Sequence, residues 1–345
     1  MKFDKRITSI CKGVAIILMV IHHIFSGMEG YGLKIFDVWV MPQLAVLGKV
    51  CVSIFLVLSG FGLYESCRDK EILLCSFYWK RFKSIYISYW LVFVIFVSIG
   101  YFVYKPSFLN FIASPYSPKC NLLLSFFGIQ YFANGYMGFN PSWWFISQII
   151  LLYLLFPFMQ KMMRSNWGTF TLAIVGLIFA TVFTSLNVRG FFINLVYFVP
   201  FIIGMFLSKY HGFDFAYCYM RNQREAILSI LTFFILSALR IRVGLNNLGI
   251  LLDSLLAPFI CALLYVLFAK NTTSNVGKVL AYLGKHSMNI YLIHLFITNM
   301  YTTPIIYGLN SPVFMVGITI LISLAFSIFI EKIKSIGDSG VQNAK

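Results

Sequence analysis

The first apolar segment of the chain, KGVAIILMVIHH, carries a lysine at its start and two histidines at its end. At about 100° per residue in an α-helix, Lys12 and His23 return to within roughly 20° of each other, about 16 Å apart along the axis. His22 lies roughly 100° away and faces elsewhere. A neutral imidazole accepts protons at cellular pH because its unperturbed pKa is about 6.5. The spacing therefore predicts a base or nucleophile, His23, on one helix stripe with a cation, Lys12.

Four further positions place polar or aromatic side chains in apolar surroundings, and each has a structural alternative. Ser59 precedes a glycine and is either a site residue or part of a close helix crossing. Trp144, in the stretch NGYMGFNPSWWF, either stacks on a sugar or belongs to an interfacial aromatic belt. His294 lies in an apolar segment, where a histidine is usually functional, and Tyr291 shares its helix face.

The amino-acid composition indicates whether water or lipid surrounds these residues. Of 345 residues, 60% are hydrophobic and only 11% are charged, and the mean hydropathy is +0.84. These values indicate a membrane protein. Apolar runs long enough to cross about 30 Å of hydrocarbon recur along the chain. We predict ten membrane-spanning helices, at 7–26, 45–65, 84–104, 143–163, 168–186, 191–208, 225–241, 247–269, 281–301 and 311–330.

The predicted fold is a single all-α domain over residues 1–345, a polytopic helix bundle, because lipid cannot satisfy the backbone of irregular chain. The segment 121–132 is too short to span and is expected to be a re-entrant or interfacial piece. With the N-terminus inside, few cations fall in outer segments, so both termini are expected in the cytoplasm. The outer cations are Lys34, Lys49, Lys105, Lys119, Arg189, Arg240 and Arg242. Arg240 and Arg242 therefore break the positive-inside rule.

This context changes the meaning of the first segment. Ionisable groups inside a spanning helix usually face a bundle interior or a wet cavity, which makes a functional interpretation the default. The alternative is that Lys12 extends to the inner surface while the histidines sit in the outer headgroup layer. The common stripe of Lys12 and His23 favours the functional pair.

Several functions are excluded by what the sequence lacks. The net charge of +16 follows from topology and attraction to an anionic inner leaflet, so we expect no nucleic-acid partner. The seven cysteines are scattered without metal-ligand spacing, and we expect no metal and no tightly bound cofactor. There is no Walker A sequence, which argues against ATP-driven work.

Four motifs in order resemble the acyltransferase-3 family of integral membrane O-acyltransferases. The first is a basic residue, ten residues, then histidine, from Lys12 to His23. The others are SIFLVLSGFGLYES (53–66), PSWWFISQIILLYLLFP (141–157) and YLGKHSMNIYLIH (282–294). Two departures stand out: lysine replaces the arginine common at the first position, and Ile149 and Ile150 occupy the places of an acidic pair. If an acid is needed, Asp253 is the carboxylate deep in a later predicted span.

The resemblance implies an enzyme that moves an acyl group, commonly acetyl, from cytoplasmic acyl-CoA to a sugar hydroxyl of a surface glycan. It implies a multi-pass protein of a prokaryotic inner or plasma membrane. His23 is the expected centre, as general base or as acyl-carrying nucleophile, and Lys12 is expected to act in catalysis by holding the donor. Arg81 is a candidate for binding the CoA phosphates, although ordinary inner-surface topology also explains it.

Alternatives from other classes stay open at this stage. A transporter or flippase for a lipid-linked sugar or small polar solute could use Lys12, His23, His294 and Asp253 as binding or proton-relay groups. A glycan polymerase would also be basic and many-spanning, and the predicted outer loop 105–142 is large. For the enzyme, we expect Lys12 and His23 to line one cavity that Ser59, Trp144 and His294 also approach, with His22 pointing away.

Overall fold

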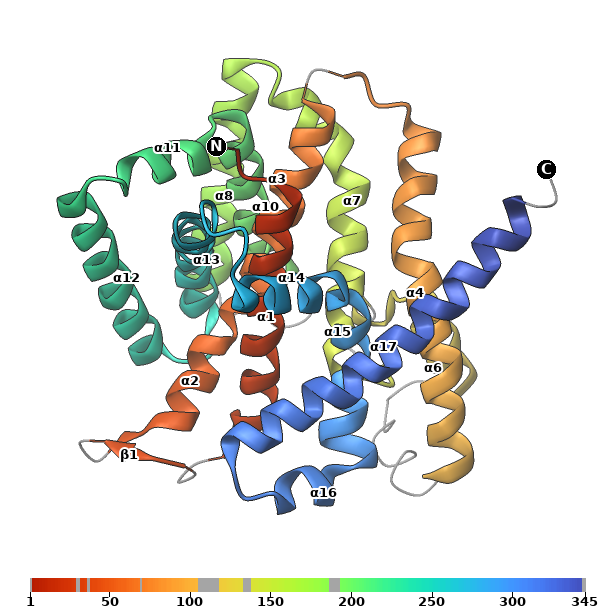
Figure 1. Ribbon diagram of the computed structural model, residues 1–345. Coiled ribbons are helices and arrows are strands. Elements are labelled where there is room, and N and C mark those ends of the chain that lie inside the picture. Colours follow the sequence, from red (N-terminus) through yellow and green to blue (C-terminus); the bar gives the residue numbers. More distant parts are fainter. Residues whose placement is uncertain are drawn as a thin grey trace. The chain divides into compact units, whose positions relative to one another are not determined.

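The computed structural model describes residues 2–28, 32–35, 38–68, 70–104, 118–132, 138–185 and 193–342. In this part of the chain the structure is almost entirely helical (Figure 1), which confirms the all-α prediction. The exception is an antiparallel ribbon of β1 (Lys34–Ile35) and β2 (Val38–Trp39), which leads into helix α2 (Val40–Gly48). Of the predicted outer loop, residues 105–117 and 133–137 lie outside the described residues, as do Arg189 and Lys345.

The chain divides into two compact units, each built from two separate stretches of sequence. Unit 1 comprises Met1–Leu73 and Leu151–Lys285. Its helices are α1 (Lys5–Phe25), α2, α3 (Val50–Cys67), α8 (Asn166–Ser185), α9 (Ile193–Val196), α10 (Phe198–Lys209), α11 (Gly212–Tyr219), α12 (Gln223–Val243), α13 (Asn247–Phe268) and α14 (Asn275–Lys285). It also takes the C-terminal part of α7 (Trp144–Met162).

Unit 2 comprises Leu74–Ile150 and His286–Lys345. Its α-helices are α4 (Leu74–Val103), α6 (Pro118–Phe126), the first part of α7, α15 (Ser287–Leu295), α16 (Thr303–Gly308) and α17 (Pro312–Gln342). Three short turns of tighter or wider helix complete it: η1 (Gln130–Phe132), η2 (Pro141–Trp143) and η4 (Phe296–Tyr301).

Seven helices in the described part are long and apolar enough to cross a membrane. They are Lys5–Phe25, Val40–Cys67, Leu74–Val103, Pro141–Met162, Gln223–Val243, Asn247–Phe268 and Pro312–Ile336. The protein is therefore multi-pass, while the count of ten and the orientation of the termini stay predictions. The remaining three predicted spans coincide with shorter elements. Two are α8 and α10, and the third, 281–301, is broken at His286 between α14 and α15.

Two predicted boundaries were wrong in a way that matters for the site. Helix α4 begins at Leu74 rather than near residue 84, so Arg81 lies on a helix and not in a loop. The segment 121–132 is not one piece: α6 ends at Phe126, a turn follows, and η1 begins at Gln130. Periodicity missed the early start of α4 because KRFK adds charge to a continuous helix.

Helix α1 is held by glycines that let two neighbours approach its backbone. A Cβ on Gly13 would lie 2.1 Å from the carbonyl oxygen of Leu280 in α14, and one on Gly284 of α14 would lie 1.8 Å from that of Ser9. On α2, a Cβ on Gly48 would lie 2.6 Å from the Leu18 carbonyl oxygen. Small residues permit such backbone contact between membrane helices. Any larger side chain at these positions would push a neighbour away from α1.

A reciprocal glycine crossing joins α3 to α10. A Cβ on Gly60 would lie 2.1 Å from the Phe201 carbonyl oxygen, and a Cβ on Gly204 would lie 2.1 Å from that of Val57. Gly62, two residues further along α3, would meet nothing within 4 Å. The close-crossing interpretation of the SGF stretch is therefore confirmed for its glycine.

We expect Gly60→Ala to lower the free energy of unfolding by about 1–3 kcal/mol, because overpacking a tight contact forces backbone movement. The matched control is Gly62→Ala on the same helix, which has open space and should change stability little. Thermal unfolding of both purified variants in detergent measures the difference. Equal destabilisation by the two substitutions would contradict the crossing.

Candidate functional site

The Lys12–His23 stripe lies on a well-anchored helix in unit 1. Helix α1 starts where the Asp4 side chain accepts a hydrogen bond of 2.8 Å from the Ile7 backbone N–H. Lys12 and His23 are both half-buried. Within the described residues the Lys12 ammonium makes no hydrogen bond or ion pair. A half-buried ammonium with three unused donors can bind a carbonyl or an anion.

The His22 ring is held in one orientation by a hydrogen bond to helix α2. Its Nδ1 lies 2.7 Å from the carbonyl oxygen of Ala45, and its Cβ lies within 3.3 Å of the position that a Gly48 Cβ would take. Because a carbonyl oxygen only accepts, Nδ1 carries the proton. The His22 and His23 rings meet edge to face with centroids 4.9 Å apart. His22 therefore contacts both α2 and the His23 imidazole, while its predicted direction away from a shared cavity stays a prediction.

Asp253 is neutralised inside unit 1. The Arg240 guanidinium donates Nε–H to Asp253 Oδ1 at 2.5 Å and Nη2–H to Oδ2 at 3.0 Å. Arg240 also donates through Nη1 to the Gly244 carbonyl oxygen at 2.7 Å. Both residues are buried, with 0% and 2% of the side chain exposed. Since both carboxylate oxygens are engaged, Asp253 is a structural partner of Arg240 and does not replace the missing acidic pair.

Ser59 is half-buried on α3, beside the Gly60 crossing. Lys12, His22, His23 and Ser59 thus all belong to unit 1. The expectation that Trp144 and His294 of unit 2 approach the same cavity stays a prediction.

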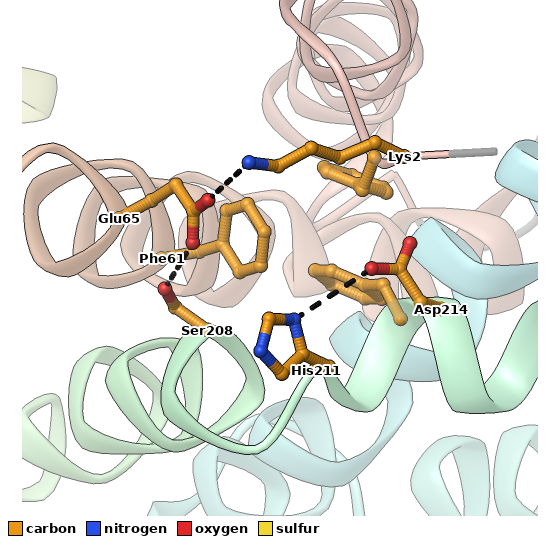
Figure 2. Close-up of a pocket in the computed structure, with 8 residues that line it drawn as sticks. Lys2, Phe61, Glu65, Ser208, His211 and Asp214 are labelled. Carbon is orange, nitrogen blue, oxygen red and sulfur yellow. Dashed lines mark hydrogen bonds and ion pairs between the residues drawn. The ribbon is translucent and has the colours of Figure 1, made fainter. Parts of the chain in front are cut away.

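A second charged region lies at the N-terminal end of α1 (Figure 2). It is a pocket lined by Lys2, Phe3, Phe61, Glu65, Ser208, His211, Phe213 and Asp214. Its charges satisfy one another: Lys2 Nζ lies 2.7 Å from Glu65 Oε1, and Ser208 Oγ donates to Glu65 Oε2 at 2.8 Å. The Arg68 guanidinium also lies 2.6 Å from Glu65. These contacts anchor the start of the chain, and they leave no uncompensated charge for a ligand.

The two tryptophans of the third motif have different environments in unit 2. Trp143 is fully buried, and its indole N–H donates to the Leu292 carbonyl oxygen at 3.1 Å. Trp144 is half-buried, with its ring centroid 5.9 Å from that of Tyr131. Burial raises the pKa of the Tyr131 phenol, so this group stays protonated and able to donate. Trp143 is therefore a packing residue, whereas Trp144 and Tyr131 form an aromatic pair suited to a sugar face.

Tyr291 and His294 lie on α15, and both are tied to their surroundings. The Tyr291 hydroxyl donates to the Ser142 carbonyl oxygen at 2.6 Å. His294 is fully buried, and its Nδ1 lies 2.8 Å from the Tyr291 carbonyl oxygen, which fixes the proton on Nδ1. Tyr291 therefore joins α15 to the turn before α7, a structural role that the sequence did not reveal.

The cationic groups of Arg81 and Lys83 lie near aromatic rings of α4. The Arg81 guanidinium lies 5.7 Å from the Phe77 ring centroid, and Lys83 Nζ lies 4.9 Å from that of Trp79. Both contacts are within the range of cation–π attraction. These interactions fit an interfacial helix as well as a phosphate site.

One polar cluster in unit 2 was missed from the sequence. Glu331 of α17 accepts hydrogen bonds from Asn289 at 2.8 Å and from Lys334 at 2.7 Å, and His286 Nδ1 lies 2.8 Å from Ser327 Oγ. The Glu331–Lys334 spacing of three residues was the available signal, but its partner Asn289 is distant in sequence.

A family model for an acyltransferase domain, that of the acyltransferase-3 family, matches residues 9–332 of the chain. The chain belongs to the acyltransferase-3 family. No curated protein and no solved structure was found to match it. The protein is therefore a membrane acyltransferase. Membership of the family implies an acyl donor, an acceptor and a surrounding lipid bilayer. Of the functions that the sequence left open, the family favours the enzyme over the transporter and the polymerase.

The match of this acyltransferase includes both units and all four motifs. The motif at 282–294 runs from α14 of unit 1 into α15 of unit 2, and its glycine, Gly284, is the one that contacts Ser9 of α1. In unit 1 the glycine of this motif therefore packs α14 against α1, the helix that carries Lys12 and His23.

We expect Trp143→Phe to lower the free energy of unfolding by about 1–3 kcal/mol, because it removes a buried donor to Leu292 and part of the ring volume. Trp144→Phe, at a half-buried position, should affect stability less and acceptor use more. Thermal unfolding and acyl transfer, measured on both variants, separate the two roles. Greater loss of stability in the Trp144 variant would reverse the assignment.

Proposed function

We propose that the protein is a membrane-bound O-acyltransferase, and specifically an O-acetyltransferase, that moves an acyl group from cytoplasmic acyl-CoA to a sugar hydroxyl of a cell-surface or exported glycan. Its place is a prokaryotic plasma membrane, which it crosses several times. The observation that carries the proposal is the pairing of Lys12 and His23 on one stripe of α1, held by backbone contacts to α2 and α14. Family membership supplies the reaction class.

The first chemical route uses His23 as a general base. Its neutral ring takes the proton of the acceptor hydroxyl while the hydroxyl oxygen attacks the thioester carbonyl carbon. A tetrahedral oxyanion forms, then collapses with cleavage of the carbon–sulfur bond. The CoA thiolate leaves and receives the proton from His23, so the products are the sugar ester and free CoA thiol.

The second route uses His23 as a nucleophile. The unprotonated imidazole nitrogen attacks the thioester carbonyl carbon, the carbon–sulfur bond breaks, and the CoA thiolate takes the proton of the other ring nitrogen. The sugar hydroxyl oxygen then attacks the acyl carbon, the carbon–nitrogen bond breaks, and the hydroxyl proton returns to the ring. In both routes the His22 ring packs edge to face against the His23 ring. Incubation with labelled acetyl-CoA without acceptor distinguishes them, because only the second route labels the protein.

The other site residues have supporting roles in this proposal. Lys12, at the opposite end of the stripe, binds a carbonyl of the donor with its free ammonium, and Arg81 binds CoA phosphate. Trp144, Tyr291 and His294 of unit 2, and Ser59 of unit 1, are each proposed to bind the acceptor. No tightly bound cofactor or metal takes part. The basic test is to give purified protein labelled acetyl-CoA and measure free-thiol release and label on candidate glycans.

We expect His23→Ala to lower the rate of acyl transfer by about 10² to 10⁴, because a positioned general base contributes that much. The matched control is His22→Asn, whose amide can still donate to the Ala45 carbonyl oxygen and which should retain most activity. Both are measured by thiol release from acetyl-CoA with acceptor present. Equal loss in the two variants would remove the support for His23 as the reacting histidine.

We expect Lys12→Ala to raise the acyl-CoA concentration needed for half-maximal rate by about tenfold to a hundredfold, the value of one charge-assisted hydrogen bond. Lys12→Arg should restore part of this loss, since the cation is kept. The rate at saturating acyl-CoA should change less than the half-saturating concentration. Unchanged donor dependence in Lys12→Ala would contradict a donor-binding role.

A further inference from the structure

A group of charged side chains in unit 1 surrounds the end of α1 that carries the histidines. Arg240 of α12 and Asp253 of α13 form the buried ion pair described above. Lys49 lies at the junction of α2 and α3, directly after Gly48, which contacts His22. The charge of Lys49 acts on Asp253, Arg240 and His22, so these four groups share one electrostatic environment.

The positive charges in this group outnumber the negative one. Asp253 is the single carboxylate, and the two oxygens of this carboxylate both accept hydrogen bonds from Arg240. Gly249 makes room for that contact, because a Cβ there would lie 3.1 Å from the guanidinium carbon. In the described part of the chain the half-buried Lys49 ammonium makes no hydrogen bond or ion pair. One positive charge is therefore left without a partner.

A second polar group lies beside Lys49 with its bonding capacity unused. Ser53 is 1% exposed, and its hydroxyl has no hydrogen-bond partner among the described residues. It follows Lys49 by four positions on a continuous helical backbone, so the two side chains share a face. Side chains in a helix lean toward its N-terminus, which brings the Ser53 hydroxyl toward the lysine. Buried polar groups are usually hydrogen-bonded, so an unpartnered pair points to an external ligand.

We propose that Lys49 and Ser53 form a binding site for an oxyanion, a carboxylate or phosphate, carried by the acyl acceptor. The inference rests on the proposed function and names the acceptor as an anionic sugar. An oxyanion supplies the acceptors that the ammonium and the hydroxyl lack, and it neutralises the charge of Lys49, because Asp253 is already paired with Arg240. The His22 ring contacts the His23 ring, and the His22 Cβ lies close to Gly48, the residue before Lys49, so an anion bound at Lys49 would hold the acceptor hydroxyl near the reacting histidine.

Two alternatives to an acceptor anion at Lys49 fit less well: an anion site in the pocket of Figure 2, and an anion that belongs to the donor. In the pocket of Figure 2 the Lys2 ammonium already lies 2.7 Å from Glu65, and the nearby Arg68 guanidinium lies 2.6 Å from the same carboxylate, so neither cation is left for an anion. The donor is proposed to bind through a carbonyl at Lys12, about 16 Å along α1 from His23. Lys49 neighbours the histidine end, which leaves the acceptor as the molecule that brings the anion.

Direct binding tests the site without requiring acyl transfer. Purified full-length protein in detergent is titrated with glucose, glucuronate and glucose 6-phosphate, and calorimetry gives each dissociation constant. We expect at least one charged sugar to bind about tenfold to a hundredfold more tightly than glucose, as for one charge-assisted contact. The carboxylate and phosphate arms identify which oxyanion is preferred. Equal binding of all three sugars to the unmutated protein would overturn the proposal.

Variants then assign the preference to Lys49. Lys49→Gln should abolish the preference for the charged sugar and Lys49→Arg should keep most of it. Arg242→Gln should leave it unchanged, because Arg242 is an exposed cation two residues from Arg240. A preference that survives Lys49→Gln would place the anion elsewhere and overturn the site. Slower acyl transfer in Lys49→Gln with the binding preference intact would also overturn it, and would assign Lys49 to the tetrahedral oxyanion.

The two proposals fail in different measurements. Charge-dependent binding that Lys49→Gln removes, without acyl-CoA turnover by the unmutated protein, would support the anion site and refute the acyltransfer proposal. Turnover with equal use of neutral and charged acceptors would support acyl transfer and refute the anion site.

Discussion

Close contact between the backbones of α1 and α14 is the constraint on which the candidate site depends. It exists because Gly13 and Gly284 have no side chains, and a methyl group at either would overlap a carbonyl oxygen of the opposite helix. Gly13 directly follows Lys12 and Gly284 belongs to the last motif. The two ends of the family's motif set are therefore joined by one packing contact within unit 1. Chemistry at Lys12 is tied to this contact, because α1 cannot rotate without losing it.

The charged side chains among apolar residues of unit 1 are of two kinds, those in an ion pair and those without a partner in the described structure. Arg240 and Asp253 form a pair whose hydrogen bonds are complete, which is how a buried ion pair avoids a large desolvation penalty. Lys12 and Lys49 have no such partner in the described structure. A half-buried, unpaired lysine is costly to keep unless it binds something. The paired charges therefore indicate structure, and the unpaired ones indicate ligands.

Local periodicity predicted what depends on one helix alone. The all-α class, the common stripe of Lys12 and His23, and the different direction of His22 all follow from 100° per residue. The pairing of Arg240 with Asp253 and of Gly13 with α14 could not be predicted, because these partners meet only in the folded unit. The break at His286 was also missed: the apolar residues on both sides suggest one span, although the polar stretch KHSMN marks the position where α14 ends at Lys285 and α15 begins at Ser287. Trp143 and Trp144 were indistinguishable in sequence, since only tertiary contacts bury one of them.

In the two proposals the unpaired lysines bind different substrates, Lys12 the donor and Lys49 the acceptor. Lys12 lies at one end of the stripe and Lys49 at the histidine end, with His22 fixed between α2 and His23. A donor and an acceptor that each carry an oxygen-rich polar group would be attracted to opposite ends of the same helix. Such separation keeps a large anionic donor from occupying the acceptor position by charge alone, which is a form of specificity by geometry. In the proposed reaction the carbonyl and the hydroxyl meet at His23, which shares the stripe with Lys12 and lies at the end of α1 near Lys49.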